Sequence, residues 1–331
     1  MKTVLSGIQP TGNLHLGNYL GSVRNWVDLQ NDYDCYFGIM DLHAITLPQD
    51  PVKLKKNVRD ALCVYLACGL DAEKSTFFVQ SQVPAITAIS WAFSCLTSMG
   101  ALNRMTQFKD KASNSDSGQD NARLGLYAYP VLMAADILAF KSDLVPVGDD
   151  QKQHLELTRD IAGIFNNKIG GDYFKLPEPM IVKQVKRIMS LQNGLSKMSK
   201  SDESDLSRIN LTDSADVIVK KVKKAKTDSL SHVSYDENRP EIYNLLNIFA
   251  SFSGEAPEDL AKTYENAGFG KFKGDLAEIL VEKLGKISYN IENLQNDEEY
   301  VSSVLRSGSL KANEKAEKTR QEIYDLLGLS I

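Results

Sequence analysis

The sequence lacks the features that would place it in a membrane or in an oxidising compartment. No apolar run approaches the ~20 residues that a membrane-spanning helix needs, and residues 1–6 are too short and too soon interrupted to form a signal peptide. The chain has only four cysteines, none of them in a C-x-x-C pair. All four stand among apolar residues, so we expect buried thiols that bind neither each other nor a metal. These absences predict a cytoplasmic protein with no membrane partner.

An excess of positive charge is missing as well. The chain contains 38 Lys and Arg residues against 43 Asp and Glu residues, which gives a net charge of −5. This balance argues against a protein that coats nucleic acid indiscriminately, and we expect no DNA partner, although a local basic surface could still bind RNA. The length of 331 residues and the ordinary composition are sufficient for two globular domains.

Two common nucleotide-binding fingerprints are absent, but another arrangement stands near the N-terminus. There is no Gly-Lys-Ser/Thr P-loop ending, and no G-x-G-x-x-G follows the first predicted strand at residues 3–5. Residues 10–18, PTGNLHLGN, instead separate that strand from an amphipathic helix predicted over residues 16–27. The N-terminus of a helix after a glycine-containing turn favours phosphate binding, and His15 and Asn18 add polar side chains there.

The rest of the N-terminal half alternates predicted strands with predicted helices. Strands are expected at residues 34–40, 76–79 and 144–147. Helices are expected to begin at Pro51, at Pro84, near Gly125 with Pro130 as an alternative start, and after Gly148. This alternation predicts an α/β fold with a Rossmann-like, doubly wound parallel sheet. Ligands of such sheets bind beyond the carboxyl ends of the strands.

The pattern changes after about residue 166. A proline pair, Pro177 and Pro179, leads into a loop that contains KMSKS at residues 197–201. Beyond that loop only helical patterns appear, with apolar stripes at residues 242–252, 276–287 and 312–327. We therefore predict an α/β domain over residues 1–190 and a smaller all-α region over residues 191–331, whose last helix could pack back on the first domain.

Three further features each leave two interpretations open. Asp136 stands in the apolar run 131–140, where it is either a buried carboxylate with a partner or a helix residue that faces solvent. Lys109 and Lys111 begin a polar loop that either has no chemical role or brings lysines to phosphates. The basic run at residues 220–226 is either a solvated helix face or a contact for RNA phosphates.

Two segments resemble the signature motifs of one enzyme family. His15-Leu16-Gly17-Asn18 and Lys197-Met198-Ser199-Lys200-Ser201 are similar to the HIGH and KMSKS motifs of class I aminoacyl-tRNA synthetases. In that chemistry a carboxylate attacks the α-phosphate of ATP and pyrophosphate leaves, so catalysis is mainly positioning and stabilisation of phosphate charge. Two lysines on a loop suit the leaving pyrophosphate, and no general base is needed.

Longer stretches resemble the bacterial tryptophanyl-tRNA synthetase family over essentially the whole chain. These stretches are residues 7–12, 41–46, 80–83, 129–138 and 146–162. The resemblance implies ATP-dependent attachment of L-tryptophan to tRNA(Trp) through a tryptophanyl-adenylate, with release of AMP and diphosphate. It also implies that ATP is used as its Mg²⁺ complex, that the protein is a homodimer, and that the helical region after Ser201 recognises the anticodon. The sequence shows no protein ligand set for a metal.

The resemblance also implies roles for individual residues. Catalysis falls to His15, Asn18, Lys111, Lys197 and Lys200. ATP binding falls to Gln9, Pro10, Thr11, Gly17, Asn18, Gly148, Asp149, Asp150, Ile188, Lys197, Met198, Ser199, Lys200 and Ser201. Tryptophan binding falls to Asp136 as acceptor of the indole N–H, to His43, Met133 and Val147 as walls of the indole slot, and to Gln9, Tyr129 and Gln151 as ligands of the amino and carboxylate groups. The indole N–H is a donor only, so a buried acceptor rejects phenylalanine.

Three alternative functions share part of this pattern. A tyrosine-specific relative would have both signatures, but it needs partners for a phenol oxygen, which the MAAD run at residues 133–136 does not favour. A nucleotidylyltransferase would share the first signature but not the KMSKS loop and the helical region. A non-catalytic paralogue that binds tryptophan or RNA would have no physical need for intact His15, Lys197 and Lys200.

Overall fold

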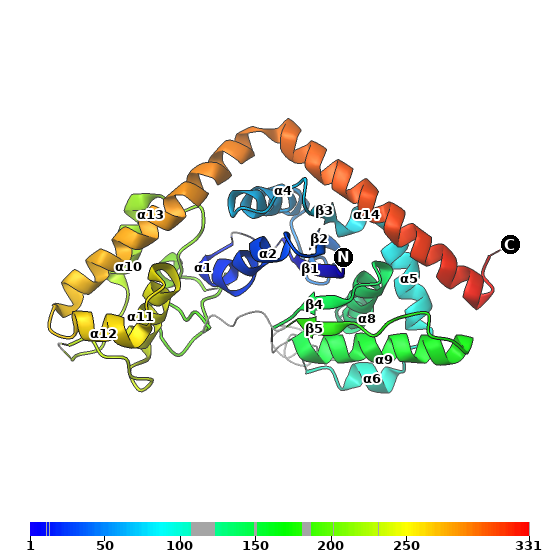
Figure 1. Cartoon of the computed structure of the whole chain (residues 1–331), viewed down its shortest axis with the longest axis horizontal. Coiled ribbons are helices and arrows are strands. Elements are labelled where there is room, and N and C mark those ends of the chain that lie inside the picture. Colours follow the sequence, from blue (N-terminus) through cyan, green and yellow to red (C-terminus); the bar gives the residue numbers. More distant parts are fainter. Residues whose placement is uncertain are drawn as a thin grey trace.

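A five-stranded parallel sheet forms the centre of the part of the chain that the structure describes. The computed structural model describes residues 1–10, 12, 14–106, 123–148, 151–180, 187–200, 202–230 and 232–330. The strands are β1 (Thr3–Ile8), β2 (Asp34–Ile39), β3 (Thr76–Val79), β4 (Leu144–Pro146) and β5 (Glu178–Met180), in the order β3-β2-β1-β4-β5 (Figure 1). All neighbours are parallel, and β1 pairs with β2 from Thr3↔Asp34 to Ile8↔Ile39. The predicted doubly wound α/β fold is therefore confirmed.

Helices cover both faces of the sheet. They are α1 (Leu16–Asn18), the π-helical η1 (Tyr19–Val23), α2 (Arg24–Leu29), α3 (Asp41–Ala44), α4 (Pro51–Ala67), the 3₁₀ turn η2 (Gln80–Gln82), α5 (Pro84–Ser94), α6 (Met99–Asn103), α8 (Leu124–Ala139) and α9 (Lys152–Ile169). Phe37 and Phe77 belong to the core that includes α2 and α4, whereas Tyr36 and Phe78 belong to the core that includes α5, α8 and α9. Because strand side chains alternate between faces, both faces are buried, as a parallel sheet requires.

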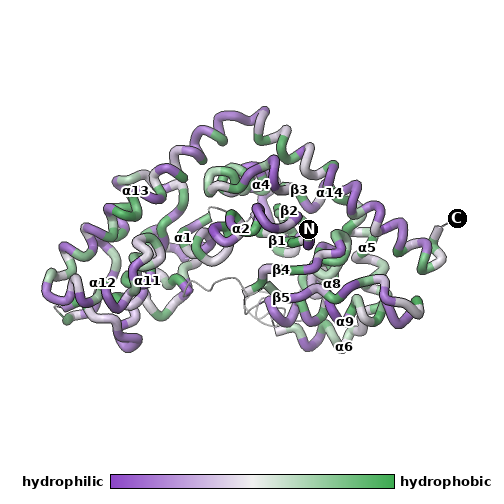
Figure 2. The backbone as a smooth tube through the Cα atoms, in the orientation of Figure 1, coloured by the Kyte–Doolittle hydropathy of each residue, from purple (hydrophilic) through white to green (hydrophobic). Residues whose placement is uncertain are grey.

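The C-terminal part is helical. It contains η5 (Asp205–Ser207), α10 (Ala215–Lys224), α11 (Pro240–Ser253), α12 (Pro257–Tyr264), α13 (Gly268–Asn296) and α14 (Glu298–Leu327). In Figure 1 the long helices α13 and α14 form an inverted V over the sheet, and Figure 2 shows hydrophilic and hydrophobic stretches alternating along both. The core on the α4 side continues into α10–α13 through Ile218, Ile242 and Leu276.

Helix α14 covers the edge of the sheet. It packs against β3 and α5, and Ser309 Oγ accepts a hydrogen bond from the Val79 N–H at 3.1 Å. A Cβ placed on Gly308 would lie 1.9 Å from the Phe77 carbonyl oxygen, so only glycine permits this approach. An uncovered edge strand offers unpaired backbone groups to other chains, and α14 shields β3 from that pairing.

Several sequence predictions need correction. The helix predicted over residues 16–27 is interrupted by the π-helical η1, and Pro130 lies inside α8, which begins at Leu124. Helix α12 had no predicted counterpart, and of α10 only the basic run at residues 220–226 was considered, as a possible helix face. Pro179 belongs to β5, an edge strand that was not predicted, where a proline costs no ladder hydrogen bond.

The prediction that all four cysteines are buried is wrong for two of them. Cys35 and Cys63 are buried, Cys68 is half-buried and Cys95 is exposed, and each is a free thiol. Among the described residues there is no cluster of His, Cys, Asp and Glu that could hold a metal ion. No helix within those same ranges is long and apolar enough to cross a membrane.

Candidate active site

The first signature lies at the carboxyl end of β1, which stops at Ile8. Gly12 has φ +103°, a conformation that favours glycine, and it turns the chain toward α1. His15 is the N-cap of α1: its Nδ1 accepts the Gly17 N–H at 3.1 Å, and its own N–H donates to Asn18 Oδ1 at 3.2 Å. Because Nδ1 is an acceptor, the neutral His15 ring carries its proton on Nε2, and Asn18 keeps its side-chain NH₂ as a donor.

The environment of His15 keeps its ring neutral. The side chain is only 3% exposed. Burial, followed by the charges of Lys200, Lys197 and Arg208, lowers the pKa of His15 from 6.5 to about 4. At neutral pH the ring is therefore a neutral hydrogen-bond donor in a positively charged surrounding, which suits contact with a phosphate oxygen.

This pKa shift predicts acid sensitivity of folding. The folded-state pKa lies below the unfolded value, so the unfolded chain binds more protons between pH 6.5 and pH 4, and stability falls as pH drops through that window. The loss attributable to His15 is expected to reach up to about 3 kcal/mol. Between pH 7 and pH 5, the free energy of unfolding measured with urea should fall less in His15→Gln than in the wild type. The exposed His232→Gln is the control, and a loss as large in His15→Gln as in the wild type would contradict the prediction.

The second signature begins in a short hairpin, residues 188–198, which contains Lys197 and Met198. Ser190 N–H donates to Ser196 O at 2.8 Å, and Met198 N–H donates to Ile188 O at 3.2 Å, around the bridge between Met189 and Lys197. Just beyond the hairpin, Lys200 Nζ donates to the Gly12 carbonyl at 3.3 Å. Burial lowers the pKa of Lys200 to about 8. The two signatures, which are far apart in sequence, are thus adjacent in the fold.

A segment that the sequence analysis missed joins these parts. Leu16 N–H donates to Ile209 O at 2.8 Å, and Leu211 N–H donates to Leu14 O at 3.0 Å, so residues 209–211 pair with the first signature. Nothing in the local sequence signals this pairing, because it depends on contacts between segments almost 200 residues apart.

An ion-pair network around a buried lysine supports that segment. Lys221, on α10, is 1% exposed, and its Nζ lies 2.7 Å from oxygens of both Asp205 and Asp213. Asp213 Oδ2 also accepts the Asn210 N–H at 2.9 Å. The interpretation of residues 220–226 as a uniformly solvated or RNA-binding face is therefore wrong for Lys221.

Replacing Lys221 is expected to destabilise the fold. In Lys221→Met the partly buried Asp213 carboxylate loses its counter-charge, and breaking such a pair costs about 3–5 kcal/mol. The midpoint of chemical unfolding should fall accordingly, whereas Lys223→Met, at an exposed position of the same helix, should leave it unchanged. Equal stability of the two variants would show that the ion pairs of Lys221 do not stabilise the fold.

A second polar cluster surrounds Asp136 on α8. The carboxylate is 2% exposed, and it accepts hydrogen bonds from His43 Nε2 at 2.8 Å and from Gln80 Nε2 at 2.7 Å. His43 follows β2 and Gln80 follows β3, so both lie at the carboxyl ends of their strands. The solvent-facing interpretation of Asp136 is wrong. Gln80 was not predicted as a site residue, although it stands in the family-like stretch 80–83.

The other residues predicted for tryptophan lie around this cluster or at the end of β4. Tyr129 is buried, its ring lies edge-on to His43 with centroids 6.1 Å apart, and its hydroxyl is 2.8 Å from His154 Nε2. Met133 is half-buried one helical turn before Asp136. Val147 and Gly148 follow β4, and Gln151 N–H donates to the Gly148 carbonyl at 3.0 Å, immediately before α9.

The described residues predicted for ATP fall into three groups. Gln9 and Pro10 follow β1, and Gly17 and Asn18 lie in α1. Gly148 follows β4. The hairpin and the residues just after it provide Ile188, Lys197, Met198, Ser199 and Lys200. Ile188 and Met198 are buried, whereas the Lys197 side chain is exposed. Five predicted residues lie outside the described residues: Thr11, Lys111, Asp149, Asp150 and Ser201. Lys109 also lies outside them.

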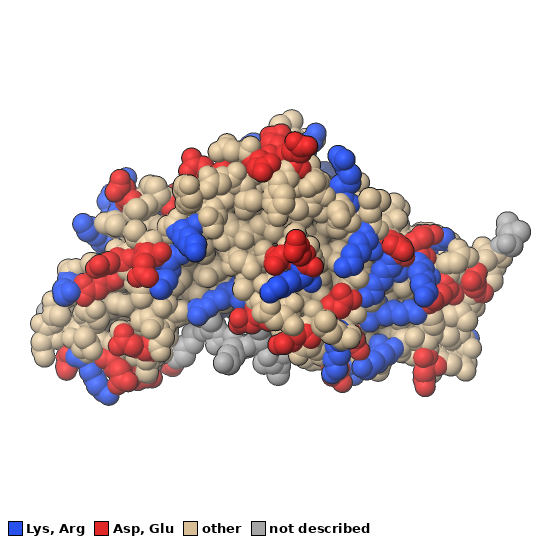
Figure 3. All heavy atoms as spheres, turned by 45° about the horizontal axis from the view of Figure 1, so that its top comes forward, with Lys and Arg blue, Asp and Glu red and all other residues tan. Residues whose placement is uncertain are grey.

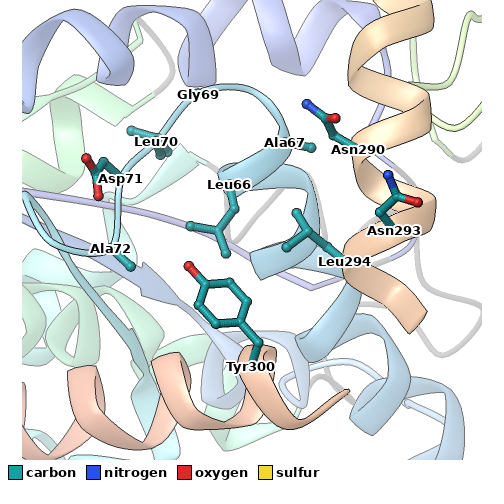
Figure 4. Close-up of a pocket in the computed structure, with 10 residues that line it drawn as sticks. All are labelled: Leu66, Ala67, Gly69, Leu70, Asp71, Ala72, Asn290, Asn293, Leu294 and Tyr300. Atoms are coloured by element: carbon teal, nitrogen blue, oxygen red, sulfur yellow. The ribbon is translucent and has the colours of Figure 1, made fainter. Parts of the chain in front are cut away.

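A separate pocket of about 400 Å³ lies where α4 ends, beside α13 and the start of α14. Figure 4 shows Tyr300 opposite Leu66, with Asn290 and Asn293 on α13. None of its lining residues was predicted for catalysis or binding. This pocket is distinct from the site at the carboxyl ends of the strands.

Comparisons with known proteins match the whole arrangement. A family model described as "tRNA synthetases class I (W and Y)" matches residues 1–285. The chain is 54% identical over its full length to the tryptophan–tRNA ligase of Rickettsia conorii and 48% identical over 99% of its length to that of Caldanaerobacter subterraneus, covering 99% of each relative. The chain therefore belongs to the class I aminoacyl-tRNA synthetases of the tryptophan and tyrosine group.

Solved structures agree with that assignment. The chain is similar to tryptophanyl-tRNA synthetase from Mycoplasma pneumoniae, with a TM-score of 0.84 and 36% identity over 100% of this chain and 98% of that one. It is also similar to the Campylobacter jejuni enzyme complexed with ADP and tryptophan, with a TM-score of 0.85 and 35% identity over 99% and 100%. The predicted activity, ATP-dependent ligation of tryptophan to tRNA, is confirmed over the tyrosine-specific and non-catalytic alternatives.

Proposed function

We propose that the chain forms tryptophanyl-adenylate between the two signature segments and the Asp136 cluster, and then transfers tryptophan to tRNA(Trp). The observation that carries this proposal is the contact between Lys200 Nζ and Gly12 O, which brings both signatures to the carboxyl end of β1. The Asp136 cluster lies at the ends of the neighbouring strands β2 and β3. ATP and tryptophan can thus meet at one edge of the sheet.

The ATP phosphates would bind to His15 Nε2–H, to the amide of Asn18 and to the lysines at positions 197 and 200. Each of these groups donates hydrogen bonds, and the lysines add positive charge where pyrophosphate departs. Gln9, Pro10, Thr11, Gly17, Gly148, Asp149 and Asp150 would surround the nucleotide, Ile188 would contact the adenine through its backbone, and Met198, Ser199, Ser201 and Lys111 would complete the site. ATP would enter as its Mg²⁺ complex, so that the ion arrives with the substrate.

The indole N–H of tryptophan would donate to Asp136. The carboxylate is a stronger acceptor than a neutral carbonyl, and His43 and Gln80 hold both of its oxygens in place. His43, Met133 and Val147 would form the walls of the slot. Gln9, Tyr129 and Gln151 would hold the substrate amino and carboxylate groups.

The helical part beyond about residue 190 would bind tRNA and read its anticodon. On the face that Figure 3 shows, basic and acidic side chains are interspersed, in keeping with the net charge of −5. Lys220, Lys223 and Lys224 remain on α10 for phosphate contacts, whereas Lys226 is paired with Glu241. A few lysines on an otherwise mixed surface would contact RNA phosphates locally, as we expect for a cytoplasmic enzyme that binds one particular RNA.

A second copy of the chain would cover an apolar face formed by α3, α5 and α8. Ile45, Trp91 and Leu124 are 53%, 72% and 78% exposed. A pocket of about 330 Å³ on this face is lined by residues from all three helices, among them Leu42, Thr87 and Leu132. Exposed apolar side chains beside such a pocket are typical of an interface. In analytical ultracentrifugation we expect the wild type to be a dimer and Trp91→Glu to be a monomer. Leu310→Glu, at an exposed position of α14, is the control and should remain a dimer. A monomeric wild type would refute the homodimer.

Separating the two chemical steps tests the activity proposal. With ATP and tryptophan alone the enzyme should retain an adenylate and release diphosphate. Adding tRNA(Trp) should then release AMP and yield tryptophanyl-tRNA, while tRNA(Tyr) should not. Charging without a prior adenylate would contradict the proposed sequence of steps.

A further inference from the structure

The hairpin of residues 188–198 has a second hydrogen-bonding edge, which faces α11. At the bridge between Met189 and Lys197, the bonds between the two arms are made by the neighbouring residues. The N–H and C=O of Met189 therefore point to the other side. There Asn244 Oδ1 accepts the Met189 N–H at 2.9 Å, and Asn244 Nδ2 donates to the Met189 carbonyl at 3.0 Å.

Asn244 thus takes the place of a third strand. Its side chain is 3% exposed, so water does not compete for these two bonds. A single carboxamide supplies one donor and one acceptor in a fixed geometry, which matches the two backbone groups of one residue. Removing it would leave both backbone groups of Met189 without their partner, in a half-buried place.

The hairpin meets α11 at its tip as well. A Cβ placed on Gly194 would lie 2.4 Å from the carbonyl carbon of Pro240, the first residue of α11, so the tip lies directly against the start of that helix. Between Met189 and the tip, Lys226 N–H donates to the Leu191 carbonyl at 2.8 Å. The hairpin is therefore attached to the helical part at both ends.

The two lysines proposed for catalysis lie in this hairpin and directly after it. Lys197 lies within the hairpin opposite Met189, and Lys200 reaches Gly12 three residues later. The position of α11 consequently sets the position of both lysines relative to the turn after β1.

We propose that Asn244 is a positioning residue that fixes the hairpin to α11 and thereby sets where Lys197 and Lys200 lie relative to the turn after β1. Asn244 touches no substrate and acts through Met189. The inference depends on the roles proposed above for Lys197 and Lys200.

The kinetic test uses Asn244→Ala and Asn244→Asp in the full-length protein. Alanine removes both bonds. Aspartate keeps an acceptor but turns a carboxylate toward the Met189 carbonyl, so a folding defect of one variant does not decide the question. In ATP–pyrophosphate exchange, both should raise KM for ATP about tenfold and leave KM for tryptophan within about twofold, because only the ATP side depends on the hairpin.

The matched control is Asn247→Ala. Asn247 lies one turn further along α11 and is 8% exposed. It accepts a hydrogen bond from the Tyr235 hydroxyl at 3.0 Å and donates to the Tyr243 carbonyl at 2.8 Å, and it has no bond to the hairpin. If Asn244 were merely structural, both alanine variants would change the two KM values alike, and that result would overturn the proposal.

A second measurement does not depend on activity. Amide hydrogen exchange of a peptide covering residues 188–200 should be at least fivefold faster in Asn244→Ala than in the wild type and unchanged in Asn247→Ala. Unchanged exchange in Asn244→Ala would show that the bonds to Met189 do not hold the hairpin. Because this readout needs no substrate, it separates failure of the positioning role from failure of the proposed activity, which a wild type without exchange activity would reveal.

Discussion

Replacing Asp136 with alanine is expected to lower kcat/KM for tryptophan in adenylate formation by about 100-fold, on the basis of about 1.5–3 kcal/mol for a hydrogen bond to a charged group. The variant removes the acceptor proposed for the indole N–H. It also leaves His43 and Gln80 without the oxygens that they now bind.

The selectivity for tryptophan over phenylalanine should fall together with kcat/KM for tryptophan. Phenylalanine has no donor for Asp136, so its small kcat/KM should not fall in the variant, and the ratio between tryptophan and phenylalanine should narrow. Asp143→Ala is the control, since Asp143 lies before β4 and holds the Thr3 N–H and Lys175 instead. An unchanged ratio in Asp136→Ala would exclude Asp136 as the specificity residue.

Replacing Lys200 with methionine is expected to lower kcat of pyrophosphate exchange by about 10²–10³-fold, the cost typical of losing one preorganised group that stabilises transition-state charge. Methionine keeps the length and apolar stem of the side chain but removes the charge beside Gly12. Lys223→Met, exposed on α10, is the matched control and should retain full activity. Full activity in Lys200→Met would remove the lysine from the catalytic set.

The pH profile offers an independent check on Lys200. Burial lowers its pKa to about 8, and the protonated form is the one that can bind phosphate. Wild-type kcat/KM for ATP should therefore be full below pH 8 and fall as pH rises through that value. Arginine stays protonated throughout, so Lys200→Arg should lack this alkaline fall. An identical alkaline limb in the two proteins would assign it to another group.

The sheet was largely predictable because its strands are short buried runs bounded by clear breakers. Residues 76–79 were predicted as a strand and form β3, and Gly69, with φ +103°, follows the end of the helix before it. The short β5 was not predictable, since its proline is acceptable only at a sheet edge, and being an edge strand is a property of the tertiary fold. The burial of Lys221 on α10 was not predictable either, because its partners Asp205 and Asp213 lie outside the helix.

Some residues of the site could likewise be predicted from the sequence and others could not. His15 and Asn18 were recognised from a contiguous motif, and their capping geometry follows from that local sequence. Asp136 was recognisable as a carboxylate in an apolar run. Gln80 and Asn244 were not, because a neutral amide carries no local signal and its role comes from a partner 56 or 55 residues away.

The most direct test of the account is pyrophosphate exchange by the wild-type protein with tryptophan, tyrosine and phenylalanine, each supplied alone with ATP and Mg²⁺. The account predicts exchange that depends on tryptophan, with tyrosine and phenylalanine at least 10³-fold less effective, because neither presents an indole N–H to Asp136. Tyrosine-dependent exchange of similar rate, or no exchange with any of the three, would contradict it.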